Sequence, residues 1–183
     1  MITAITGPVC SGKTEYLIKR INKSFACSSD IEVYKPYQDT RNPGKLVSRN
    51  GEEFECEDLS LNMMESVWNS AIFIDEINLI PVEYTDKFIE TIFLLCKQEN
   101  LIYGAGLNLT SNMLVYPQMA AFMAIADDIK VLTASCKYCK GAAQYSEYIG
   151  KEEVKGVQDH KIGYDFRPVC FSCKFVAERK EYL

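Results

Sequence analysis

The 183-residue sequence has no long hydrophobic run. No segment approaches the roughly 18 consecutive apolar residues that a membrane-spanning helix needs. The first ten residues are largely apolar but lack the basic start of a secretory signal, so we do not expect them to be one. Apolar residues still make up 48% of the chain, a share typical of a globular protein. We therefore expect a cytoplasmic protein that makes no contact with a membrane.

An excess of basic charge is also missing. The chain has 20 lysines and arginines against 25 aspartates and glutamates, which gives a formal net charge of −5 at pH 7. Domains that bind nucleic acid usually carry a basic stripe, so we expect no nucleic-acid partner. A nucleotide or nucleoside held by a few local groups remains compatible with this charge. Internal repeats, heptads and low-complexity stretches are missing as well.

Hydrophobic runs and helical spacings alternate along the first 134 residues. Alternation of this kind predicts an α/β fold with a parallel sheet, right-handed crossovers and helices on both faces. The character of the chain changes after residue 134, where helical periodicity fades, and we place a domain boundary between residues 1–134 and 135–183. The expected strands are 2–6, 30–36, 45–47, 71–74, 101–107 and 129–133, and the expected helices are 13–25, 59–69 and 81–98.

A glycine-rich motif follows the first expected strand and opens the first expected helix. Its pattern Gly-x4-Gly-Lys-Thr is that of a phosphate-binding loop, in which backbone N–H groups turn toward the phosphates, the lysine reaches the β- and γ-phosphates and the threonine hydroxyl binds Mg²⁺. The alternative is an incidental glycine turn. Because a strand precedes and a helix follows, we predict a P-loop (RecA-like) domain that binds ATP through Gly7, Pro8, Val9, Cys10, Ser11, Gly12, Lys13 and Thr14.

Asp75 and Glu76 come directly after the apolar run 71–74. Open α/β sheets place their ligands at the carboxyl ends of such buried strands. A first carboxylate there can hold Mg²⁺ through water, and the second is then available as a general base. A solvated acidic pair is the alternative interpretation. Beside a phosphate loop, the pair predicts phosphoryl transfer to a hydroxyl group.

Four of the eight cysteines form two Cys-x-x-Cys pairs. Four thiolates at tetrahedral reach suit Zn²⁺, and a full set of protein ligands favours a structural role over a catalytic one. Unpaired core thiols or a redox pair are the alternatives. The gap between the pairs is longer than in common zinc ribbons, so a loop must project between them. The predicted zinc ligands are Cys136, Cys139, Cys170 and Cys173.

Together, these three features resemble the type II thymidine kinases, the zinc-containing family of cells, phages and poxviruses. Several further segments are similar to motifs of that family, in the same order along the chain. They are Val33-Tyr34-Lys35-Pro36 with Asp39-Thr40-Arg41, Ser48-Arg49-Asn50-Gly51, Gly106-Leu107, and Leu132-Thr133-Ala134 before the first cysteine pair.

The resemblance implies ATP-dependent phosphorylation of the 5′-hydroxyl of thymidine by a homotetramer. It implies that Glu76 is the base, that Lys13 acts on the transferring phosphate and that Arg41 stabilises its charge. Asp75 and Thr14 would serve Mg²⁺. Two more residues, Asp39 and Asn78, are expected on the cofactor side. The segment between the cysteine pairs would be the lasso loop, which closes over the nucleoside base.

Departures from the family pattern gather on the nucleoside side, where Asn78 and Leu79 replace the usual Gln and Phe. One hypothesis is a kinase that accepts thymidine, or another or modified deoxynucleoside, through different packing. The other is a non-catalytic ATP-binding zinc-ribbon adaptor. Retention of the complete phosphate side favours the kinase. The substrate contacts that we expect are Leu79, Leu107, Ser111, Tyr116 and, from the lasso, Tyr164 or Phe166.

Overall fold

The computed structural model describes residues 1–26, 30–151, 156–157 and 165–176. Six parallel strands form the central sheet, in the order β5-β2-β6-β7-β1-β8. Their bounds are β1 Ile2–Thr6, β2 Asp30–Lys35, β5 Glu57–Asp58, β6 Ser70–Ile74, β7 Leu101–Gly106 and β8 Asp128–Val131. β1, β6 and β7 are the most buried strands of the sheet. Apolar residues of each strand belong to two hydrophobic cores, one on each face of the sheet.

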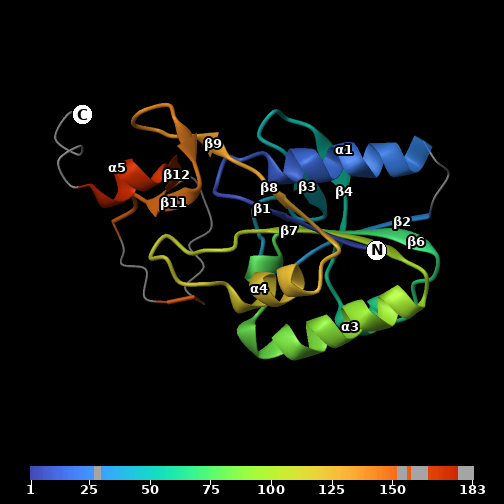
Figure 1. Ribbon diagram of the computed structural model, residues 1–183. Coiled ribbons are helices and arrows are strands. Elements are labelled where there is room, and N and C mark those ends of the chain that lie inside the picture. The colour runs from blue at the N-terminus through green and yellow to red at the C-terminus, as the bar shows by residue number, and fades with distance from the viewer. Residues whose placement is uncertain (27–29, 152–155, 158–164, 177–183) are drawn as a thin grey trace.

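Helices cover both faces of this sheet (Figure 1). Helix α1 (Lys13–Ala26) packs on one face, where Leu17 and Ile21 meet Ile5 and Phe73. Helices α3 (Thr85–Lys97) and α4 (Pro117–Ala124) pack on the other, together with Ala4. Because neighbouring strand residues point to opposite faces, one strand supplies both cores. The predicted α/β fold with a parallel, two-sided sheet is confirmed.

The connections between strands contain several short elements. A two-stranded hairpin of β3 (Lys45–Val47) and β4 (Glu53–Glu55) follows β2. A short helix α2 (Leu61–Met64) leads to β6, and the 3₁₀ turns η1 (Ile77–Leu79) and η2 (Val82–Tyr84) lead from β6 to α3. Among the described residues, no helix is both long and apolar enough to cross a membrane.

Two expectations about helices were wrong in part. The helix expected over 59–69 is limited to Leu61–Met64, and the chain then turns through Asn69, whose φ of 47° lies in the left-handed region. Trp68, near the end of the expected helix, is 64% exposed. The helix expected from residue 81 begins with a 3₁₀ turn and becomes α-helical only at Thr85. Helix α4 had no counterpart among the expected elements.

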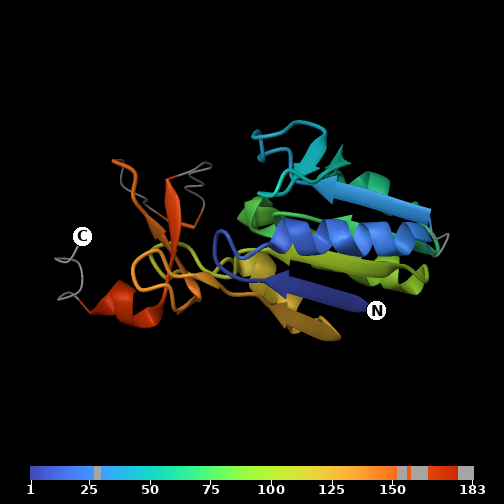
Figure 2. The ribbon, with the colours of Figure 1, turned by 90° about the horizontal axis from the view of Figure 1, so that it is seen from above.

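The last part of the chain forms a small lobe at one end of the sheet (Figure 2). It contains the pairs β9 (Ala134–Ser135) with β10 (Ala142–Ala143) and β11 (Tyr145–Tyr148) with β12 (Phe166–Val169), followed by helix α5 (Phe171–Phe175). Its core contains Cys136, Ala143, Val169 and Cys173. We call residues 134–176 the zinc lobe, and the boundary at 134/135 stays a prediction.

Candidate active site and metal centre

The phosphate loop connects β1 to α1 and depends on its glycines. Gly7 has a φ of 151°, and a Cβ at this position would lie 2.4 Å from the Leu132 carbonyl oxygen, so a side chain cannot fit. Gly12 has a φ of 82°, which only glycine adopts at little cost. Its carbonyl then accepts the first helical hydrogen bond, from the Tyr16 N–H at 2.8 Å. The two glycines thus allow the tight path of the loop, and the N-terminus of α1 faces it.

Lys13, the first residue of α1, is buried against this loop. Its Nζ donates hydrogen bonds to the carbonyls of Gly7 at 3.0 Å and Pro8 at 2.9 Å. Burial lowers the pKa of Lys13, and the negative charges of Glu76 and Asp75 partly offset that effect. An ammonium group placed in this way can supply positive charge beside a bound phosphate.

Thr14 and Asp75 meet across the site, as the Mg²⁺ prediction requires. Asp75 follows β6, is 3% exposed, and accepts a hydrogen bond from Thr14 Oγ1 at 2.8 Å through Oδ2. Its other oxygen accepts the Glu76 N–H at 3.0 Å. Burial, reinforced by the neighbouring charge of Glu76, raises the pKa of Asp75 to about 6. The hydroxyl and the carboxylate are the oxygen ligands that Mg²⁺ prefers, so this pair could hold the ion.

Glu76 faces an arginine from another part of the chain. Its backbone is left-handed, with a φ of 52°, at the point where the chain leaves β6 for η1. Its Oε1 accepts a hydrogen bond from Arg41 Nη2 at 2.6 Å. Arg41 also donates to Asp39 through Nε at 2.7 Å and Nη2 at 3.0 Å. Burial opposes the charge of the guanidinium, but these two carboxylates outweigh it and raise the pKa of Arg41.

A buried lysine fixes the segment that carries Arg41. Lys35, at the end of β2, is 1% exposed and donates from Nζ to the carbonyls of Asn42 at 2.5 Å and Lys45 at 3.0 Å. Its Nζ also lies 3.7 Å from Asp39 Oδ2. Because a buried ammonium needs several acceptors, the loop after β2 folds around it. Lys35 therefore determines where Asp39 holds the guanidinium of Arg41.

Most of the predicted site residues line a single cleft of about 230 Å³. Gly7, Pro8, Asp39 and Asp75 do not line it, but each is hydrogen-bonded to a residue that does. Tyr164 lies outside the described residues. Several lining residues were not predicted as site residues: Glu15, Val47, Arg49, Leu109, Thr110 and Ser146. Arg49 lies in the motif-like segment 48–51 but was given no role, and no motif marks the other five. The predicted residues that do line the cleft are Val9, Cys10, Ser11, Gly12, Lys13, Thr14, Arg41, Glu76, Asn78, Leu79, Leu107, Ser111, Tyr116 and Phe166.

Asn78 has a structural contact in addition to its place in the cleft wall. It is 1% exposed, and its Oδ1 accepts the backbone N–H of Leu107 at 2.7 Å. A Cβ on Gly106 would lie 2.9 Å from the same oxygen, so glycine is needed there for the close approach. Asn78 thus fixes the start of the segment that joins β7 to α4. We call residues 107–116 of that segment the substrate loop.

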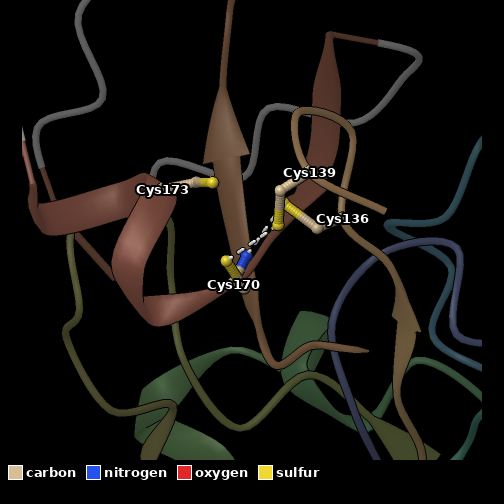
Figure 3. A group of neighbouring side chains, drawn as sticks. All are labelled: Cys136, Cys139, Cys170 and Cys173. Carbon is tan, nitrogen blue, oxygen red and sulfur yellow. Dashed lines mark hydrogen bonds between the residues drawn. The ribbon is translucent and has the colours of Figure 1, made fainter. Parts of the chain in front are cut away.

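The four predicted zinc ligands come together in the zinc lobe (Figure 3). All four sulfur atoms lie within 4.8 Å of one another. The Sγ atoms of Cys139 and Cys170 are 3.6 Å apart, close to the spacing that Zn–S bonds of about 2.3 Å produce in a tetrahedron. Cys136 Sγ also accepts the Cys170 N–H at 3.4 Å. The donor set and its spacing therefore fit a structural zinc ion.

The fold and this site define a P-loop nucleotide-binding protein with a cysteine cluster suited to zinc. Residues 1–174 match the protein family described as thymidine kinase. The chain belongs to the thymidine kinase family. The resemblance that the sequence motifs indicated is thereby confirmed.

Curated relatives support the assignment over most of their length. A thymidine kinase of Mycoplasma mobile is 30% identical over 187 residues, which cover 99% of this chain and 90% of the relative. A thymidine kinase of Bacteroides fragilis is 27% identical, covering 94% and 85%. One from Pyrobaculum aerophilum is 27% identical, covering 76% and 77%. Among solved structures, RuvB of Thermotoga maritima aligns with a TM-score of 0.42 at 17% identity. The alignment covers 75% of this chain and 39% of RuvB, and a similarity at that level supports no conclusion about function.

Proposed function

We propose that the protein transfers the γ-phosphoryl group of ATP to the 5′-hydroxyl of thymidine. One observation carries the proposal: a single cleft joins the phosphate loop to the substrate loop, and Glu76 lines the cleft together with both. A donor on the phosphate loop and an acceptor on the substrate loop would therefore meet at this carboxylate. Membership of the thymidine kinase family supports thymidine as the acceptor.

Each group on the phosphate side has a definite task in this proposal. The N–H groups of the phosphate loop and Lys13 would bind and orient the phosphates. Thr14 and Asp75 would hold Mg²⁺, which supplies charge neutralisation when bound. Arg41 would stabilise charge on the transferring group. Since phosphoryl transfer depends mainly on positioning and electrostatics, a preorganised set of this kind suffices.

Glu76 would accept the proton of the attacking 5′-hydroxyl. One of its oxygens is engaged by Arg41, which holds the carboxylate in place without occupying the second oxygen. The O–H bond of the acceptor breaks toward that carboxylate, and the hydroxyl oxygen forms the new bond to phosphorus. The bond from the γ-phosphorus to the bridging oxygen breaks, and ADP leaves.

A kinase for another or modified deoxynucleoside is the second candidate. The Oγ atom of Ser111 is buried in the wall of the cleft and has no hydrogen-bond partner among the described residues. Buried hydroxyls are usually paired, so this one could pair with a ligand group if the wall of the cleft opened toward it. It therefore favours an acceptor with a polar group near Ser111. The non-catalytic adaptor has no comparable observation in its favour.

A panel of nucleosides tests the proposal most directly. The zinc-loaded protein with Mg²⁺ and ATP should release ADP in proportion to the 5′-monophosphate formed, with thymidine as the first substrate. Release with a different deoxynucleoside and not thymidine would select the second candidate. ATP binding without turnover of any nucleoside would contradict both. Zinc analysis and gel filtration of the same sample would test the structural zinc and the homotetramer that the family implies.

A further inference from the structure

Strand β11 of the zinc lobe contacts the phosphate loop through one side chain. Ser146 is 5% exposed, and its Oγ accepts a hydrogen bond from the Val9 backbone N–H at 3.1 Å. Val9 belongs to the phosphate loop, 137 residues earlier in the chain. The hydroxyl of Ser146 therefore fixes the direction of one amide in the loop whose amides are expected to face phosphate.

Helix α5 of the same lobe contacts the substrate loop. Lys174 is half-buried, and its Nζ donates to the Ser111 carbonyl at 2.8 Å and to the Ser146 carbonyl at 3.2 Å. One ammonium group thus joins α5, β11 and the tip of the substrate loop. Hydrogen bonds to a charged group are stronger than neutral ones, which makes this a firm attachment for an irregular segment.

Backbone hydrogen bonds within the substrate loop connect its two sides. The Thr110 N–H donates to Leu114 at 2.8 Å, the Met113 N–H donates to Thr110 at 3.1 Å, and the Tyr116 N–H donates to Asn108 at 3.1 Å, each to a backbone carbonyl. The base of this loop is fixed by Asn78, and its tip by Lys174. Displacement of the tip would therefore carry the cleft-lining residues of the loop with it.

The position of Lys174 depends on the cysteine cluster. Lys174 directly follows Cys173, and α5 starts after Cys170, so two of the four clustered cysteines bracket the first turn of the helix. The Lys174 N–H donates to the Cys170 carbonyl at 3.0 Å. A zinc ion held by these thiolates would fix α5 at this turn and with it the ammonium group.

We propose that Lys174 and Ser146 form a clasp through which the zinc lobe positions both loops of the cleft. Lys174 positions the substrate loop, and Ser146 positions the phosphate loop. Both are positioning residues, since they act on the cleft through Ser111 and Val9. The clasp itself follows from the contacts alone, and only its effect on turnover rests on the proposed kinase activity.

Hydrogen–deuterium exchange of the ligand-free, zinc-loaded protein tests the clasp without requiring catalysis. Lys174→Met should speed amide exchange in residues 107–116 about tenfold or more, because the bonds of the loop tip open more often. Ser146→Ala should instead speed exchange in the phosphate loop, where the Val9 amide loses its acceptor. Lys97→Met, at an exposed position in the last turn of α3, should change neither segment.

Removal of zinc with a chelator should reproduce both effects in the wild-type protein. Zinc content must stay near one ion per chain in Lys174→Met, so that loss of the metal is not mistaken for loss of the ammonium. Lys174→Arg, which keeps a donor and a charge, should restore slow exchange at least in part. Unchanged exchange in residues 107–116 of zinc-loaded Lys174→Met would overturn the proposal.

The kinetic consequence is a crossed pattern. Lys174→Met should raise KM for the nucleoside about tenfold with a smaller effect on KM for ATP, and Ser146→Ala should do the reverse. A merely structural role would lower the melting temperature and leave both KM values unchanged. If the wild-type protein phosphorylates no nucleoside, the proposed function fails, and the exchange measurements still decide whether the clasp exists.

Discussion

Arg41 Nη2 lies 2.6 Å from Glu76 Oε1, so the expected catalytic base is already paired with the expected charge-stabilising group. The two residues come from separate connections, one after β2 and one after β6, which are neighbours in the sheet. Substitution can separate the roles of the two residues. When Glu76 is changed, Arg41 keeps its hydrogen bonds to Asp39, and when Arg41 is changed, the Glu76 carboxylate is left to solvent.

Glu76→Gln should reduce turnover of thymidine by about 100-fold or more, because the amide cannot accept the hydroxyl proton. The amide oxygen of the substituted side chain can still accept the hydrogen bond from Arg41, so ATP affinity should change little. Steady-state assay of ADP release and equilibrium titration with ATP measure the two effects. Glu90→Gln, at an exposed position in α3, serves as the control. Normal turnover in Glu76→Gln would remove Glu76 as the base.

Arg41→Met should lower kcat by about 100-fold or more with a small change in KM for thymidine, since the charge to be stabilised develops during transfer. Arg41→Lys should recover only part of the loss, because an ammonium cannot match the paired contacts of the guanidinium with Asp39. Loss of thymidine affinity at constant kcat would show that Arg41 positions substrate instead.

Asp75→Asn should abolish Mg²⁺-dependent turnover and yet stabilise the metal-free protein near pH 7.5 by up to about 3 kcal/mol. Burial raises the pKa of Asp75 to about 6, above its ordinary value of 3.8. With a folded pKa above the unfolded one, the contribution of Asp75 to stability is fully present below pH 3.8 and is lost as pH rises through 6.

The stabilising effect of Asp75→Asn should therefore grow between pH 4 and pH 7 and then level off. Urea unfolding in EDTA at several pH values measures this difference. Asp86→Asn, at an exposed position in α3, should show no such dependence. A constant difference across the pH range would mean that the carboxyl group does not titrate in this window.

Cys173→Ser should reduce bound zinc from about one ion per chain to nearly none, because a buried member of the four-thiolate set is lost. The zinc lobe should then become sensitive to protease, while the sheet domain stays folded. Cys56→Ser, at a half-buried position outside the cluster, should keep its zinc. Full zinc binding by Cys173→Ser would contradict the assignment of this cysteine as a ligand.

Local patterns predicted five strands of the central sheet and the glycine-rich motif between β1 and α1, but not the short edge strand β5. The run 71–74 is continuously apolar, which predicts a buried strand. The motif beginning at Gly7 contains two glycines whose positive φ values a loop of this kind requires. Helix α4 escaped prediction because the segment Pro117–Ala124 is apolar on nearly all sides and so shows no helical period. Residues 65–69 were expected to continue a helix that ends at Met64 in the structure, and Trp68 in this segment is exposed.

The contacts that hold the cleft together could not be predicted in this way. Lys35 holds the loop after β2 by donating hydrogen bonds to two backbone carbonyls. Because every residue has a backbone carbonyl, no sequence motif identifies these partners. The same is true of Lys174 with Ser111 and of Ser146 with the Val9 amide. Proximity between residues more than 60 positions apart depends on the complete topology, which local periodicity does not contain.

Strand β1 is the first strand of the sheet in the chain, and both of its neighbours come late. Ile2 pairs with Ile102 in β7, and Thr3 pairs with Asp128 in β8. Contacts between residues so distant in sequence form slowly, because a long chain must be ordered before they are made. During synthesis, β1 can pair with β7 only after residues 101–106 have been made, and with β8 only after residues 128–131 have been made. The strand that leads into the phosphate loop therefore gains both of its neighbours only after most of the described chain has been made.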